Sequence, residues 1–189
     1  MAVATTTIPE SMTHAEVRRA QRDAWRAIAA IFLISGFALS SWISRIPTIT
    51  DKLDLSTGHV GTALMAIAAG AIIAFPTTGR FVDTLGSART LQIFGLIMLC
   101  TLPVIGLAPN LLILIPILFV FGAGNGGLDV SMNAQGVTVE KFVGRNIMNS
   151  LHGFFSLSTL SDHTQAAREE AAAARRSVFA AREAAQPVA

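Results

Sequence analysis

The longest charge-free stretch of the chain is residues 90–128, in which 39 consecutive positions carry no formal charge. A helix of about 20 residues crosses a hydrocarbon core of about 30 Å, so this stretch is long enough for two crossings. Pro109 and Asn110 supply a turn signal inside it. The stretch therefore predicts two membrane helices, over about 90–107 and 111–130, joined by a tight hairpin.

Two further charge-free stretches predict two more spans. Residues 27–44 give 18 uncharged positions, and residues 55–79 give 25, with an apolar body at about 60–78. A last stretch, 146–160, is short and rich in polar residues, so it predicts only a partial fifth span. The expected fold is all-α: a polytopic membrane bundle of four to five transmembrane helices.

The composition supports lipid as the solvent of this chain. Hydrophobic residues make up 52% of it and charged residues only 14%, whereas a soluble domain carries about a quarter charged residues. The one cysteine, Cys100, excludes an internal disulfide. Trp25 and Trp42 flank the first apolar stretch, where an interface belt would place them. The bilayer is therefore an expected partner, and nucleic acid is not.

The distribution of basic residues predicts the orientation. If the N-terminus is cytoplasmic, the outer loops hold only Arg45 and Lys52. The inner flanks then hold eight basic residues: Arg18, Arg19, Arg22, Arg26, Arg80, Arg89, Lys141 and Arg145. This positive-inside bias predicts an integral membrane protein whose N-terminus lies in the cytoplasm. Residues 1–26 would form a cytoplasmic tail, with 14–26 as a candidate interfacial helix.

The turn between the second and third spans contains a spaced motif of Gly79, Asp83, Gly86 and Arg89. We expect Gly79 to let one helix end and its neighbour approach closely. We expect Asp83 to precede the third helix and to accept hydrogen bonds from its free backbone N–H groups, next to the positive end of the helix dipole.

This motif resembles the signature of the major facilitator superfamily, Gly-x-x-x-Asp-Arg/Lys-x-Gly-Arg-Arg/Lys, in the loop between helices two and three. Thr84, Ser87 and Ala88 depart from it where basic residues are usual. The resemblance, from about 27 to 157, implies the amino-terminal half of a transporter. Stretches 41–47, 124–135 and 145–153 look like a bacterial branch distantly similar to the fucose–proton symporters.

The resemblance implies a secondary transporter of a small polar solute, coupled to an ion such as the proton. Family members hold the solute between two six-helix halves and rock these halves to alternate access. By resemblance, Asp83 is a conformational latch that pairs with a basic residue on a neighbouring helix end. No catalytic motif, cofactor motif or metal-ligand spacing occurs in the chain, so no enzyme, cofactor or metal site is expected.

Asn125, Asp129 and Asn133 recur at intervals of four and form one stripe on the fourth predicted helix. The symporter branch carries an acid in this helix followed four residues later by Asn, so Asp129 is the candidate for proton or solute binding. The alternative is a hydrated carboxylate close to the cytoplasmic face, because Asp129 lies about 28 Å along the helix from Leu111.

Two more polar residues are candidates for solute or proton contact. Arg45, next to Pro47, is expected to end the first helix and either to face the central cavity or to extend to the outer interface. The related symporters place an acid near this position. His152, in the partial fifth span, is the other candidate, and its alternative role is structural.

Small residues form a packing face in the fourth predicted helix, with Gly122 and Gly126 in a G-x-x-x-G pattern. Such faces allow helices to approach closely. Gly36, Gly61 and Gly70 in the first two spans are interpreted in the same way.

Residues 161–189 differ in character, being rich in alanine and charge, and they cannot form a membrane helix. One explanation is that unrelated sequence replaces the natural continuation, which leaves a truncated transporter without full activity. The other is a membrane interaction module that does not transport and that carries a soluble helical tail. The oligomeric state is left open.

Overall fold

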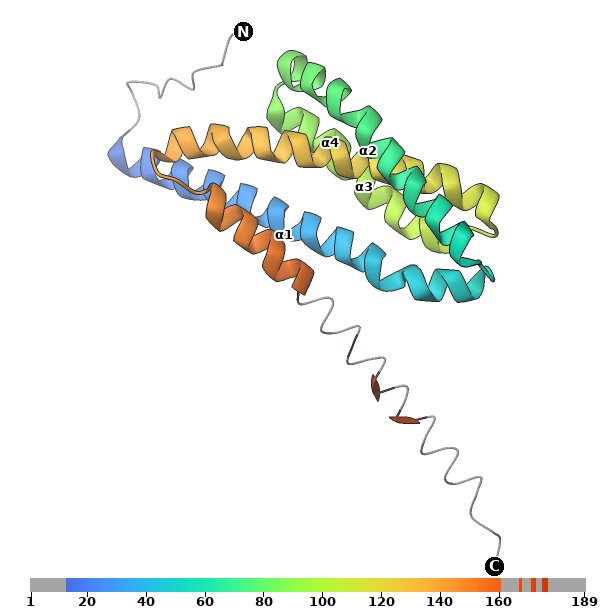
Figure 1. The fold of residues 1–189 in the computed structure, drawn as a ribbon. Coiled ribbons are helices and arrows are strands. Elements are labelled where there is room, and N and C mark those ends of the chain that lie inside the picture. The colour runs from blue at the N-terminus through green and yellow to red at the C-terminus, as the bar shows by residue number, and fades with distance from the viewer. Residues whose placement is uncertain (1–12, 161–166, 168–170, 173–174, 177–189) are drawn as a thin grey trace, which may run out of the picture.

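The computed structural model describes residues 13–160, 167, 171–172 and 175–176, and within them it is all-helical. The long helices are α1 (His14–Lys52), α2 (Thr57–Leu85), α3 (Ser87–Leu107) and α4 (Leu111–Val143). A shorter helix follows over residues 148–160 (Figure 1). Each of the four long helices is long and apolar enough to cross a bilayer, which confirms the expected all-α membrane bundle. Most of the alanine-rich segment 161–189 lies outside the described residues.

α1 is one continuous helix and extends beyond the uncharged stretch 27–44 at both ends. It begins after Thr13, whose hydroxyl accepts the Glu16 N–H while the Glu16 carboxylate accepts the Thr13 N–H at 2.7 Å. Residues 14–26, expected as a candidate interfacial helix, are helical and continue without a break into the first predicted span. The helix also runs through Pro47 to Lys52, so Arg45 does not end it.

The ends of α3 and α4 agree with the predicted spans at the hairpin between them but not at the far end of α4. α3 stops at Leu107 and α4 starts at Leu111, the boundaries that the turn signal predicts. α4 continues 13 residues beyond the predicted limit at 130, to Gly144 in the left-handed conformation (φ 72°). Gaps between charges locate the part of a helix that fits in lipid, but the helix itself continues until a cap or a glycine stops it.

α4 packs closely against both α2 and α3 because its glycines point in two directions. A Cβ added to Gly122 would overlap the Ile67 carbonyl of α2, and one added to Gly127 would overlap the Phe94 ring of α3. Gly126 likewise abuts α2 and Gly124 abuts α3, while Gly70 of α2 abuts the α4 backbone. This confirms the packing interpretation of these glycines. For Gly61 the interpretation is wrong, since no described atom lies within 4 Å of its added Cβ.

The 148–160 helix packs along α1 (Figure 1). Phe154 meets Trp25 edge to face with ring centroids 6.0 Å apart, and a Cβ on Gly36 would overlap Ser158 and approach the Phe155 carbonyl at 2.6 Å. Trp42, in contrast, is buried at 5% exposure and stacks on the α4 core, so its assignment to an interface belt is wrong.

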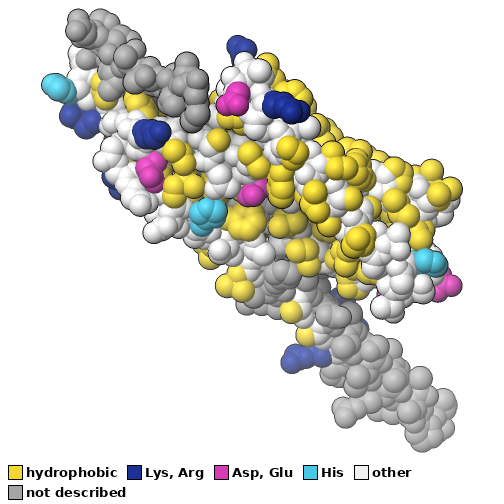
Figure 2. Space-filling model, turned by 45° about the horizontal axis from the view of Figure 1, so that its top comes forward, with side chains coloured by type: hydrophobic (Ala, Val, Ile, Leu, Met, Phe, Trp, Pro, Cys, Tyr) yellow, Lys and Arg dark blue, Asp and Glu magenta, His cyan; other side chains and the backbone are white. Residues whose placement is uncertain are grey.

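The surface of the bundle separates into an apolar middle and charged ends. In Figure 2 hydrophobic side chains cover the middle of the visible face, and Lys and Arg side chains of the helices lie toward one end. The large exposed hydrophobic residues include Ile72 on α2 (65% exposed) and Leu96 on α3 (64%). In water this surface would be costly, whereas against acyl chains it is the expected lining.

Candidate functional site

A carboxylate and two carboxamides form the polar stripe on α4. The Asn133 amide donates to the backbone oxygen of Asp129 at 2.8 Å and to its carboxylate Oδ1 at 3.2 Å. Both residues lie on one face because they are four positions apart. The Asp129 side chain is otherwise exposed, and no basic side chain of residues 13–160 forms an ion pair with it.

The stripe borders a hollow of about 220 Å³ between four helices. Asn125 and Asp129 contribute its polar groups from α4, and Ser35 of α1 adds a hydroxyl. The apolar walls come from α1, α2, α4 and the 148–160 helix: Leu39, Ala71, Phe75, Leu128, Met132 and Phe155. A mostly apolar hollow with a few convergent polar groups is the usual form of a small-molecule site.

Contacts with α1 and α2 show where Asp129 lies along the bundle. Ser35 of α1 lies level with Met132, since the Ser35 hydroxyl is 3.5 Å from the Met132 sulfur. Ser35 is nine positions after Arg26, well inside the uncharged stretch of α1. Phe75, which lines the same hollow, precedes the nearest charge on α2 by five residues.

Asp129 is therefore not at the end of its helix. It lies 18 residues after Leu111 and 14 before Val143, so both ends of α4 are about 20 Å or more away. α4 extends 13 residues beyond the predicted limit at 130, but the distance from Leu111 to Asp129, about 27 Å along the helix, is unchanged. A carboxylate among uncharged stretches of the neighbouring helices is costly and is kept only with polar neighbours or access to water.

Arg45 and His152 do not line this hollow. Arg45 is exposed and borders a separate hollow of about 250 Å³ between α1 and α3. The exposed His152 ring meets the buried Phe32 ring edge to face, with centroids 5.4 Å apart. The structure brings together Asn125, Asp129 and Asn133 but leaves these two candidates elsewhere.

At the α2–α3 corner only Gly86 breaks the helix. Its φ of 82° and ψ of 155° belong to a region that is nearly restricted to glycine. Asp83 lies in the last turn of α2, with an exposed side chain, and α3 has no side-chain cap. The expected capping by Asp83 is wrong, because Gly86 starts α3 directly.

The other two motif residues are also exposed or loosely packed. No described atom lies within 4 Å of a Cβ added to Gly79, so the close approach expected there is wrong. Arg89 is exposed in the first turn of α3. Within residues 13–160, neither Asp83 nor Arg89 has an ion-pair partner.

Two further side chains hold this part of the bundle together and were missed from the sequence. The Ser87 hydroxyl donates to Gln135 Oε1 at 2.6 Å, which ties the start of α3 to α4. The Glu140 carboxylate accepts the Ile147 and Met148 N–H groups at 2.8 and 3.1 Å, which caps the 148–160 helix. The seven-residue separation between Glu140 and Ile147 is not a local capping pattern, so only the turn at Gly144 brings them together.

Four packed helices that are each long and apolar enough to cross a bilayer define an integral membrane protein of the polytopic α-helical class. Residues 4–160 match the Major Facilitator Superfamily, and the chain belongs to that family. Membership in a transporter family agrees with the expectation that the chain is not an enzyme.

Three curated relatives are similar to the same part of the chain. A protein named as a transporter in Sinorhizobium fredii is 36% identical over 136 residues, which cover 72% of this chain and 36% of the relative. An MFS-type transporter of Yersinia pestis is 32% identical over 67% of this chain and 33% of its own length. The membrane protein MosC of Rhizobium meliloti is 33% identical over 71% of this chain and 33% of its own length.

This chain thus spans about a third of the length of the relatives it matches. No solved structure matches it.

Proposed function

We propose that this chain is the amino-terminal part of a secondary transporter that moves a small polar solute across the plasma membrane by ion coupling. The membrane domain would cover residues 27–160, with the N-terminus in the cytoplasm. The observation that supports the proposal most is the hollow bordered by Asn125 and Asp129. It occurs in a chain that belongs to a family of transporters.

Asp129 is the proposed proton-binding or solute-contacting group. Its carboxylate borders the hollow and accepts a hydrogen bond from Asn133, which holds it against α4. A carboxylate with no ion-pair partner among residues 13–160 can exchange a proton without breaking a salt bridge. The spacing of Asp129 and Asn133 also supports the distant relation to the fucose–proton symporters.

The test uses an intact relative that carries the same carboxylate, reconstituted in vesicles and supplied with a panel of polar solutes under an imposed proton gradient. The change Asp129→Asn should abolish gradient-driven accumulation while solute exchange at equal pH persists if the carboxylate carries the proton. Loss of exchange as well would indicate solute contact. The matched control is Asp51→Asn, an exposed carboxylate near the end of α1. Unchanged coupled uptake in Asp129→Asn would eliminate the role.

Asp83 and Arg89 are proposed as parts of a latch that acts in the whole transporter. Both are exposed at the end of the bundle that holds most of its basic residues, so they are free to pair with helices outside residues 13–160. Asp83→Asn in the intact relative should change the rate of alternation rather than solute affinity. A change in affinity at constant rate would count against the latch.

The orientation is testable by thiol labelling. In a Cys100→Ser background, an impermeant maleimide should label Asp51→Cys in intact cells and Arg145→Cys only after lysis. The reverse pattern would overturn the cytoplasmic placement of the N-terminus.

We also expect residues 1–189 alone to support no uptake, since a solute site between two six-helix halves needs both. Uptake by this chain equal to that of the intact relative would contradict this.

A further inference from the structure

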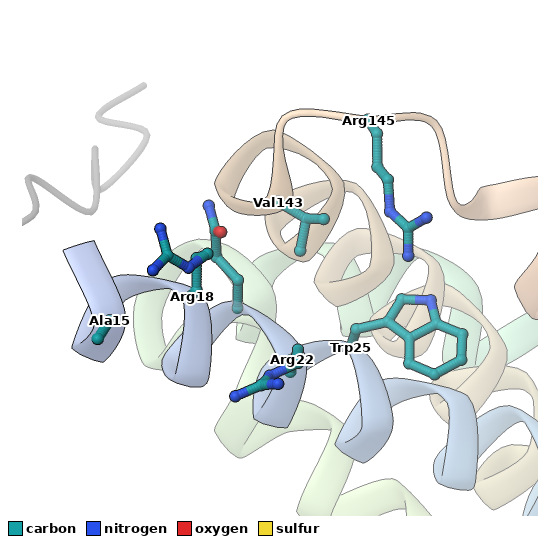
Figure 3. A pocket seen from close by; sticks show the side chains of 7 residues that line it. Ala15, Arg18, Arg22, Trp25, Val143 and Arg145 are labelled. Carbon is teal, nitrogen blue, oxygen red and sulfur yellow. The ribbon is translucent and has the colours of Figure 1, made fainter.

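A second hollow, of about 430 Å³, lies at the end of the bundle where α1 begins and α4 ends (Figure 3). Arg18, Arg22 and Trp25 line it from one stripe of α1, at spacings of four and three residues. Arg145 lines it from the turn that follows α4. In Figure 3 the Arg145 side chain points toward the Trp25 indole. Three arginines and a tryptophan from segments far apart in the sequence therefore line one hollow.

This arrangement is held in place by the backbone around it. The Gln21 amide, on the same face of α1, donates to the Phe142 carbonyl at 2.8 Å. This bond fixes the start of α1 against the last turn of α4. Gly144, with its φ of 72°, then turns the chain so that Arg145 comes over α1. The hollow is a feature of the fold and not of one long side chain.

The charge of the hollow is uncompensated among the described residues. None of the residues that line it is acidic. The nearest carboxylates along the chain have other partners: Asp23 pairs with Arg19 at 4.0 Å, Glu16 caps Thr13, and Glu140 caps the 148–160 helix. Three planar, permanently charged groups with free donors match the oxygens of a phosphate group.

The position of the hollow points to a lipid as the source of that phosphate. Trp25 is half-buried, and two residues later the uncharged stretch of α1 begins, so the indole lies at the border between polar and apolar surface. Tryptophan and arginine at such a border are typical of the headgroup layer. We propose that this hollow binds the phosphate of an anionic membrane phospholipid, with its acyl chains against the apolar surface beyond Trp25.

The test uses the full chain in mixed micelles with phosphatidylglycerol that carries bromine on its acyl chains, which quenches nearby tryptophan. In a Trp42→Phe background, quenching of Trp25 should rise with phosphatidylglycerol and should saturate, whereas brominated phosphatidylcholine should quench only weakly. The triple change Arg18→Gln, Arg22→Gln and Arg145→Gln should weaken the phosphatidylglycerol response by about tenfold or more relative to the control. Arg145→Gln alone should weaken it in part.

The matched control, Arg19→Gln, Arg26→Gln and Lys141→Gln, removes the same charge from the same end but touches no residue that lines the hollow. Equal loss in both triple variants would show a diffuse surface effect and would overturn the site. Equal quenching by the two lipids would also overturn it. Reversal of quenching by millimolar inorganic phosphate would assign the site to a soluble phosphate and would overturn the lipid proposal.

Discussion

Glu140 Oε2 lies 2.8 Å from the backbone nitrogen of Ile147 and accepts its N–H, although Glu140 belongs to α4 and Ile147 lies just before the 148–160 helix. This bond, with a second to Met148, sets the direction in which the chain leaves α4 and returns along α1. The 148–160 helix supplies Phe155 to the wall of the hollow beside Asp129. The cap that Glu140 provides for this helix therefore helps to form the candidate site.

We predict that Glu140→Ala destabilises the packing of the 148–160 helix by about 1–2 kcal/mol, since two N–H groups lose their acceptor. Glu140→Gln keeps an acceptor and should cost less. Trp25 fluorescence in a Trp42→Phe background, followed during denaturation in mixed micelles, is the measurement, because Trp25 meets Phe154 edge to face. Lys141→Ala is the control, and an equal effect of Lys141→Ala would contradict the capping role.

A second prediction concerns the α2–α3 corner. Gly86→Ala places a Cβ on a backbone with φ of 82° and should cost about 1–3 kcal/mol. Gly79→Ala, in the interior of α2 with no described atom near its added Cβ, should instead stabilise by about 0.5–1 kcal/mol. Thermal unfolding of the two variants in detergent compares them. Similar shifts in Tm would show that the motif glycines act through something other than backbone conformation.

A third prediction addresses the crossing of α2 and α4. Gly122→Ala forces its new methyl group into the Ile67 backbone and should cost about 1–3 kcal/mol, because α2 has to move. Gly61→Ala, an exposed helical glycine with open space around it, serves as the control and should be neutral or stabilising. Denaturant titration measures both free energies of unfolding. A neutral Gly122→Ala would mean that the helices do not approach as closely as described.

A fourth prediction concerns pH. The Thr13 backbone N–H and then its hydroxyl hold the pKa of Glu16 below its usual range, at the start of α1 and outside the uncharged span. The cap therefore contributes stability above the unfolded-state pKa and loses it as the pH falls through the lowered folded-state pKa. A carboxyl NMR titration in micelles measures this. Thr13→Ala should raise the pKa of Glu16 part of the way back, and an ordinary pKa in the unmodified chain would refute the cap.

How far the sequence predicts the candidate site depends on the range of each interaction. Asn125, Asp129 and Asn133 share a face because of helical periodicity, so their grouping was readable in advance. The hollow beside them could not be predicted from the sequence, since its walls come from four helices. The sequence also gives Arg45 and His152 as candidates for solute or proton contact, because polarity in a membrane stretch does not reveal which way a side chain faces.

The sequence by itself determined the number of long membrane helices and the hairpin between α3 and α4. These follow from the cost of placing charge in hydrocarbon and from the turn signal at Pro109 and Asn110, which are properties of a residue and its immediate neighbours. The tertiary structure alone decided the true helix lengths, the hollow beside Asp129 and the contact between Glu140 and Ile147. Each of these depends on caps and on packing against distant helices, because a helix continues past the bilayer until its last backbone groups find another partner.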